Sequence, residues 1–315
     1  MSSRLVVADE VREALDAGSP VVAFESTVLT HGLPYPQSLE LALGVESIAR
    51  NHGCVPATIG VVNGAIHVGM SAGTIERLAS DEHAAKASSF DLAFVAASGR
   101  SAGTTVSGTL AVCDHVGIHV FATGGVGGVH RGARDTFDIS HDLLSIAQAR
   151  AITVCAGAKA ILDLPKTLEY LETAGACVIG YGTRRFPAFY SRDSGLDLEY
   201  SAHSADDIAR AFALRRELGL SGGMLVAAPV PEEYEIPAAE IELYIQQAID
   251  MAEQRGVRGK ALTPFLLSYL AQITHGRSVR TNLALLENNA EVASRIAGAI
   301  SQLCVEIQSK EDCSC

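Results

Sequence analysis

One lysine in an apolar stretch is the first candidate for chemistry in this sequence. Lys159 lies in VCAGAKAILD, residues 154–163, among small and apolar neighbours, in a chain where arginine outnumbers lysine nineteen to five. A lysine in weakly polar surroundings loses solvation, so its pKa falls and its amine becomes a nucleophile. The same pattern fits a lysine whose alkyl stem covers a helix start while its ammonium group stays in water. Residue types alone leave both interpretations open.

The densest group of polar residues lies between Thr123 and Asp142. Glycines at 124, 125, 127 and 128 allow backbone amides to approach a ligand or form a tight turn, and no dinucleotide or Walker pattern is present. A set of ionisable and hydroxyl side chains follows: His130, Arg131, Asp138, Ser140, His141 and Asp142. Such carboxylates hold Mg²⁺ or Mn²⁺ when water completes the shell. Ser140 is equally suited to cap the helix predicted after it.

Further candidate groups lie near the ends of other predicted strands. Glu25 ends the first apolar strand, and His31 lies in the loop after it. Lys86 precedes an apolar run, where its cation either stays solvated or reaches into a site. Residues 104–109, TTVSGT, combine hydroxyls with a helix start, which suits an anion. Because ligands collect at the carboxyl ends of strands in open α/β sheets, we expect these groups to share an edge with Lys159.

The elements that would position these groups alternate along the chain. Short apolar runs predict buried strands at 20–26, 91–98, 118–125, 151–157, 176–182 and 223–230. Asn63-Gly64 predicts a hairpin within 56–70, and Ser71 is placed to cap the next helix. Lys159 is expected at the start of the helix after 151–157. Amphipathic helical patterns separate the strands, and from Pro237 onward the pattern is almost entirely helical.

This alternation predicts an α/β fold: a mixed, mostly parallel sheet flanked by helices, with a helical C-terminal third. The sequence contains no low-complexity linker and no internal repeat. We therefore expect a single domain over residues 1–315, with a frayed tail from about residue 305.

Composition and charge narrow the classes of function. The chain is 48% hydrophobic with a net charge of −12, which argues against a nucleic-acid or anionic-membrane surface but allows a phosphorylated substrate. No segment reaches the roughly 18 apolar residues of a membrane span, and acids stand where a signal peptide would be apolar. Seven scattered cysteines predict buried free thiols in a reducing compartment. We expect a cytoplasmic location.

Six long segments resemble one known family: FESTVLTHGLPYPQ, VPATIGVVNGAIHVGMS, FATGGVGGVHRGARDTFDIS, CAGAKAILDLPKTLEYLET, GKALTPFLL and TNLALLENNA. Together they are similar to the pseudouridine-5′-phosphate glycosidase family, also called indigoidine synthase A-like, over nearly the whole chain. The resemblance implies a single α/β domain, usually a homotrimer. Such a protein cleaves or forms the C–C glycosidic bond between ribose 5-phosphate and a nucleobase.

The resemblance also implies residue roles. Lys159 would form a Schiff base with C1 of the opened ribose, which then serves as an electron sink. Glu25 would donate protons, and Asp138 would hold one Mn²⁺ through a mostly aqueous shell. The substrate-binding residues that the resemblance implies are Lys86, Val106, Thr123, His130, Ser140, His141, Asp142 and Asn282.

Three segments near the expected substrate depart from the family pattern. KASSFD has Ser89 and Phe90 where an Arg-Arg pair is expected, SAGTTVSG replaces NGATTV, and APVP at 228–231 replaces NPIP. Phe90 would suit a larger or flatter aglycone if it lines the site, or else belongs to the core. Because cleavage and synthesis share Lys159 and Glu25, a glycosidase and an alnumycin-type C-ribosyl synthase for an aromatic aglycone both stay open. A non-catalytic sugar-phosphate binding protein is a third hypothesis.

Overall fold

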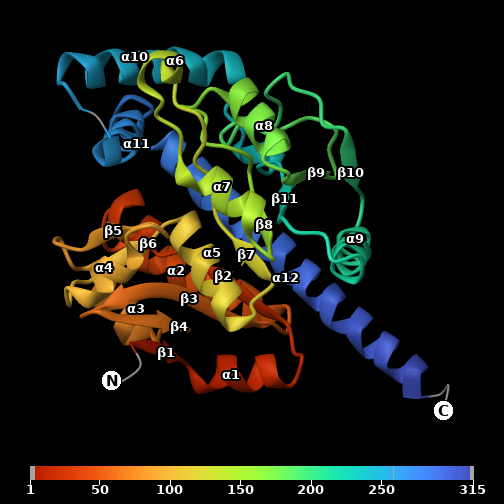
Figure 1. The fold of residues 1–315 in the computed structure, drawn as a ribbon. Helices are drawn as coiled ribbons and strands as arrows, with labels where there is room; N and C mark the ends of the chain where they lie inside the picture. Colours follow the sequence, from red (N-terminus) through yellow and green to blue (C-terminus); the bar gives the residue numbers. More distant parts are fainter. Residues whose placement is uncertain (1–3, 258, 313–315) are drawn as a thin grey trace.

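The computed structural model describes residues 4–257 and 259–312, and a central sheet dominates this part of the chain (Figure 1). Its strand order is β1-β4-β3-β2-β7-β8-β11-β9-β10, with β6 pairing β3 and β5 pairing β6. The strands are β1 (Leu5–Val7), β2 (Val21–Phe24), β3 (Val55–Val62), β4 (Ala65–Val68), β5 (Ala85–Ala87), β6 (Ala102–Thr104), β7 (Val120–Ala122), β8 (Ile152–Cys155), β9 (Cys177–Tyr181), β10 (Tyr200–Ala202) and β11 (Met224–Ala227).

Most of these strands pair in parallel, as predicted. The run from β3 through β2, β7, β8, β11 and β9 to β10 is parallel, whereas β3 pairs antiparallel with both β4 and β6. Every residue of β2, β7, β8 and β11 is buried, because helices cover both faces of a parallel sheet. Asn63 and Gly64 both have positive φ, which confirms the predicted hairpin turn between β3 and β4.

Helices cover the sheet in two layers. On one face α12 contacts α2 and α9 and crosses β2, β7 and β8, while α5, α7 and α8 pack together on the other face (Figure 1). The helices are α1 (Asp9–Asp16), α2 (Gln37–Asn51), α3 (Ala72–Ala79), α4 (Leu92–Ala97), α5 (Val106–Val116), α6 (Ala133–Thr136), α7 (His141–Gln148), α8 (Leu164–Thr173), α9 (Ala205–Glu217), α10 (Ala238–Gln254), α11 (Leu262–Ile273) and α12 (Arg277–Asp312); short turns lie at Val28–Gly32, Glu232–Tyr234 and Gly259–Ala261.

The C-terminal region is helical from α10 onward, as predicted. Helix α12 projects past the body of the molecule and continues to Asp312, whereas we expected a frayed tail from about residue 305 (Figure 1). Residues 313–315 lie outside the described part of the chain. No helix within residues 4–257 and 259–312 is long and apolar enough to cross a membrane.

The predicted strand at 91–98 is wrong, because this segment forms helix α4. Leu92, Val95 and Ala96 are buried and Phe94 is 77% exposed, a spacing of three and four residues that places the apolar side chains on one helical face. The Ser88 amide donates to the Asp91 carboxylate at 2.7 Å, which starts the turn locally. Lys86 consequently lies within strand β5 and not before a strand.

The cysteine prediction holds for part of the set. Cys54, Cys113 and Cys155 are buried free thiols, and burial raises the pKa of Cys54 to about 11. Cys177 is half-buried. The prediction of a buried thiol is wrong for Cys304, which is exposed because this position of α12 faces outward. Cys313 and Cys315 lie outside the described residues.

Candidate active site

Three neighbouring parallel strands deliver the main candidates to one edge of the sheet. Phe24 is paired with Ala122, and Ala122 with Val154, so the chain leaves β2, β7 and β8 at the same level. Glu25 and Thr123 directly follow β2 and β7 and therefore lie side by side. Strand order, and not sequence separation, brings these distant residues together, as expected for the carboxyl edge of an α/β sheet.

Lys159 lies in the loop after β8, which corrects the prediction of a helix start. Helix α8 begins later, at Leu164, because the Asp163 side chain caps it by accepting the Lys166 amide. The Lys159 amide donates to the Val126 carbonyl at 3.1 Å, and its Nζ donates to the Gly125 carbonyl at 2.6 Å. Both contacts hold the lysine against the glycine-rich segment that follows β7.

Gly157 determines how closely this loop packs. Its φ is +81°, and a Cβ there would lie 2.0 Å from the Pro187 carbonyl oxygen. A larger residue would therefore be strained and would push apart the two segments that meet at this point. The position requires glycine two residues before Lys159.

Glu25 is half-buried beside these groups. The Thr123 hydroxyl donates a short hydrogen bond to Glu25 Oε1. Burial raises the pKa of Glu25, the positive charge of Lys159 and the Thr123 hydrogen bond oppose that rise, and Asp142 adds to it. A carboxyl with a raised pKa retains its proton closer to neutral pH, as a general acid requires.

Asp142 joins two parts of the site. Its Oδ1 accepts the Ser107 amide at the start of α5, and its Oδ2 accepts the Gly127 amide, both at 3.0 Å. Ser140 caps α7 by accepting the Asp142 amide, which confirms the predicted cap. A Cβ on Gly127 would lie 2.2 Å from Ser140 Oγ, so glycine permits this close approach. The Asp142 carboxylate therefore accepts from the Ser107 amide of the predicted anion site and connects the start of α5 to the glycine-rich segment.

Asp138 is placed as a single carboxylate next to His130. The His130 amide donates to the Asp138 carbonyl at 3.0 Å, and Nδ1 of the ring lies 4.0 Å from Asp138 Oδ2. Burial lowers the pKa of His130, and the nearby Lys159 and Lys86 charges lower it further against the effect of Asp138. Within the described residues no three His, Cys, Asp or Glu side chains form a metal cluster. One partly exposed carboxylate fits a cation that keeps most of its water ligands.

Two adjoining cavities are lined by every residue that the resemblance assigns to the site, whereas Arg131 lines neither and pairs with Glu242. The large chamber, about 290 Å³, and the small chamber, about 70 Å³, share Glu25, Lys86 and Lys159 in their linings. The large chamber also includes Val106, His130, Asp138, Ser140, His141 and Asp142. The small chamber also includes Thr123 and Asn282, together with His31, Phe189, Leu267 and Leu286. The lysine and the glutamate therefore stand where a polar chamber meets a more apolar one.

Phe90 lines the large chamber and is not part of the core. Its side chain is 65% exposed, and its ring meets the His141 ring edge-on with centroids 5.7 Å apart. Both rings line the same chamber as Lys86. Phe90 thus stands near the cationic, hydroxyl-rich end of the site.

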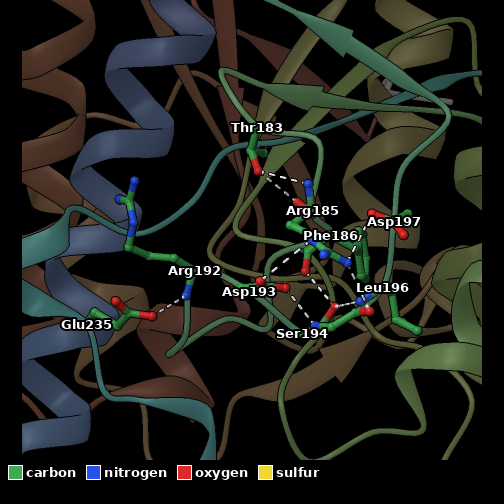
Figure 2. Close-up of polar contacts among 10 residues, drawn as sticks. Thr183, Arg185, Phe186, Arg192, Asp193, Ser194, Leu196, Asp197 and Glu235 are labelled. Carbon is green, nitrogen blue, oxygen red and sulfur yellow. Dashed lines mark hydrogen bonds and ion pairs between the residues drawn. The ribbon is translucent and has the colours of Figure 1, made fainter.

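Phe189 is a lining residue that the sequence analysis missed. It has a positive φ of 61°, and its amide donates to the Ala156 carbonyl at 2.9 Å. The irregular segment around it is tied down by polar contacts such as Ser194 Oγ to the Phe186 carbonyl and the Arg192 amide to Glu235 (Figure 2). No local pattern marks Phe189, because its place depends on packing between segments distant in sequence. Thr27 and Thr263, which line both chambers, were missed for the same reason.

Comparison with known proteins yields a consistent set of relatives. Residues 10–299 match the model of the family described as indigoidine synthase A like protein. A pseudouridine-5′-phosphate glycosidase of Caldanaerobacter subterraneus is 48% identical over 96% of this chain and 99% of its own length. Another, from Sorangium cellulosum, is 51% identical over 98% of each chain.

Solved structures agree with this assignment. The prealnumycin C-glycosynthase AlnA, in complex with ribulose 5-phosphate, superposes with a TM-score of 0.88 at 37% identity over 96% of this chain and 98% of its own. An indigoidine synthase A-like protein from Thermotoga maritima gives a TM-score of 0.86 at 36% identity with the same coverage. With its sequence, fold and strand-end site all in agreement, this chain belongs to the indigoidine synthase A-like, or pseudouridine-5′-phosphate glycosidase, family.

Proposed function

We propose that this protein is a C-glycosidase that reversibly converts pseudouridine 5′-phosphate and water to uracil and ribose 5-phosphate. The observation that carries the proposal is the position of the Lys159 amine and the Glu25 carboxyl in the linings of both chambers. The relatives named as pseudouridine-5′-phosphate glycosidases support the choice of substrate. A non-catalytic sugar-phosphate binding protein would have no use for a lysine and a desolvated acid placed together.

Cleavage requires an electron donor at C1 of the ribose and a proton on the base carbon, because carbon is otherwise a poor leaving group. Lys159 Nζ forms a bond to C1 while the bond from C1 to the ring oxygen breaks, and that oxygen takes up the proton that the nitrogen loses, which frees the nitrogen lone pair. Glu25 donates a proton to the base carbon, and the nitrogen lone pair then forms the imine. The electrons of the C–C bond return to the uracil ring as it leaves. Water hydrolyses the imine to free ribose 5-phosphate and the lysine.

The two chambers suit the two halves of the substrate. Lys86, Ser140 and His141 in the large chamber supply a cation and donors for the sugar phosphate. Phe189, Leu267 and Asn282 in the small chamber supply flat apolar contact and one amide, which suits a pyrimidine. Phe90 would then lie beside the sugar phosphate and not beside the base.

A divalent cation is the cofactor that the site would hold. Asp138 would be the protein ligand of one Mn²⁺, with water in the other positions. The ion would supply positive charge close to the sugar phosphate. His130 lies beside this carboxylate, so its ring would be placed to contact a water of that shell.

A second candidate is a C-ribosyl synthase that joins ribose 5-phosphate to an aromatic aglycone. The TM-score of 0.88 to the prealnumycin C-glycosynthase favours it as the alternative. It uses the same lysine and glutamate in the reverse direction. We further propose a homotrimer in the cytoplasm, where phosphorylated sugars are retained because they do not cross membranes unaided.

Trapping of the imine tests the proposal. The full-length protein is incubated with ribose 5-phosphate, reduced with borohydride, and analysed by intact mass and peptide mapping. We expect one covalent adduct at Lys159, no adduct in Lys159→Ala, and wild-type labelling in Lys166→Ala, whose side chain is 62% exposed. Absence of the adduct in the wild type would refute both candidates. An adduct without uracil release from pseudouridine 5′-phosphate would favour the synthase.

A further inference from the structure

Asn289 is a fully buried polar residue on the face of α12 that packs against the sheet. It is 0% exposed, like its helix neighbours Leu285, Ala290 and Ala293. Its Nδ2 donates to the carbonyls of Thr123 at 2.8 Å and Gly124 at 3.2 Å. Its Oδ1 has no hydrogen-bond partner. A buried polar atom without a partner costs about 1–3 kcal/mol, so the two hydrogen bonds from Nδ2 are made against that cost.

The two carbonyls that Asn289 holds belong to residues 123–125, the backbone segment that contacts both Glu25 and Lys159. The side chain of Thr123 donates to Glu25, and the carbonyl of Gly125 accepts from Lys159 Nζ at 2.6 Å. Three consecutive residues therefore connect the buried amide, the acid and the amine. Any shift of this backbone changes the positions of both reacting groups together.

We propose that Asn289 is a positioning residue, which fixes the backbone of Thr123 and Gly124 so that Glu25 and Lys159 are held in register for proton donation and imine formation. This inference rests on the proposed function. A misplacement of about 1 Å at a catalytic group costs on the order of 10²-fold in rate. An amide is suited to the task because it offers two N–H donors to two adjacent carbonyls.

Asn288 provides a matched control. It is the preceding residue of α12, and its Nδ2 donates to the carbonyl of Pro229 at 3.3 Å, after strand β11. Pro229 does not line either chamber. Loss of the Asn288 amide therefore removes a helix-to-sheet hydrogen bond of the same kind without touching the segment that carries Thr123.

The test compares full-length Asn289→Leu and Asn288→Leu with the wild type, using uracil release from pseudouridine 5′-phosphate and borohydride trapping with ribose 5-phosphate. We expect kcat to fall about 10²-fold in N289L with KM changed less than about threefold, and slower formation of the Lys159 adduct. The kcat-against-pH profile of N289L should also shift, because Thr123 no longer holds Glu25 in one place. N288L should keep the wild-type kcat and profile.

Folding is followed by thermal midpoint in every variant. If N289L fails to fold, Asn289→Ala is measured in its place. A folded N289 variant with wild-type kcat and pH profile would overturn the inference, and so would failure of both variants to fold, since the role would then be one of stability. Absence of the adduct in the wild type would instead refute the proposed function.

Discussion

Thr123 donates a hydrogen bond from its hydroxyl to the carboxylate of Glu25 across the ends of two neighbouring parallel strands. Thr123 is 1% exposed, so water does not compete for this bond. It links the strand that carries the acid to the glycine-rich segment that carries the partner of Lys159.

Thr123→Val keeps the shape of the side chain and removes the donor. Burial and the charge of Asp142 raise the pKa of Glu25, whereas the charges of Lys159 and Lys86 and the hydrogen bond from Thr123 lower it. Loss of the Thr123 hydroxyl should therefore raise this pKa further. Turnover that needs the protonated carboxyl is lost as pH rises through its pKa. The decline of kcat in T123V should therefore occur at higher pH than in the wild type. Thr109→Val, a buried threonine bonded to Thr104, serves as control and should leave the profile unchanged.

Glu25→Gln should lower turnover about 10²–10⁴-fold and yet stabilise the fold at neutral pH. Burial raises the pKa of Glu25 above its ordinary value of 4.5. A carboxyl whose pKa is raised in the folded state makes its full contribution to the free energy of unfolding below pH 4.5. This contribution is lost as pH rises through the folded-state pKa. The thermal midpoint of E25Q should therefore exceed that of the wild type by more at pH 8 than at pH 5.

Glu46→Gln separates stability from catalysis. Burial also raises the pKa of Glu46, although its hydrogen bond from Thr58 opposes the rise, and it lines neither chamber. E46Q should show the same pH trend in thermal midpoint with wild-type turnover. A loss of turnover in E46Q equal to that in E25Q would contradict the assignment of the acid.

Asp138→Asn should weaken Mn²⁺ binding and reduce turnover, because the carboxylate is the proposed ligand. Dialysis against a chelator should abolish wild-type activity, and added Mn²⁺ should restore it. Calorimetric titration with Mn²⁺ reports binding without reference to turnover. Asp135→Asn, at an exposed position of the neighbouring helix α6, should bind Mn²⁺ as the wild type does. Activity that persists in full after chelation would remove the metal from the proposal.

Asp142→Asn should lower the free energy of unfolding by about 1–3 kcal/mol, because an amide accepts from one of the two backbone N–H groups and presents a donor to the other. Urea denaturation measures the change. Asp114→Asn is the control: Asp114 accepts a single backbone amide, from Arg150, at an exposed position. Its substitution should cost less than about 1 kcal/mol. Equal losses in the two variants would mean that Asp142 does not join the two segments.

The sequence by itself determined the features that depend on neighbouring residues. Asn63-Gly64 favours positive φ whatever surrounds it, so the hairpin was predictable. Ser71 and Ser140 cap their helices through contacts within three residues. The long family segments likewise singled out Lys159 and Glu25 as candidates, since a resemblance is carried by residue order and needs no geometry.

Tertiary structure decided what depends on contacts between distant segments. Residues 91–98 are as apolar as a strand, but they form a helix because only Leu92, Val95 and Ala96 face the core. The loop position of Lys159 depends on Val126 and on the close approach of Pro187 to Gly157. The hydrogen bonds of Asn289 span more than 160 residues. Local sequence sets backbone preferences, whereas strand order and packing place an acid, an amine and a buried amide around one segment.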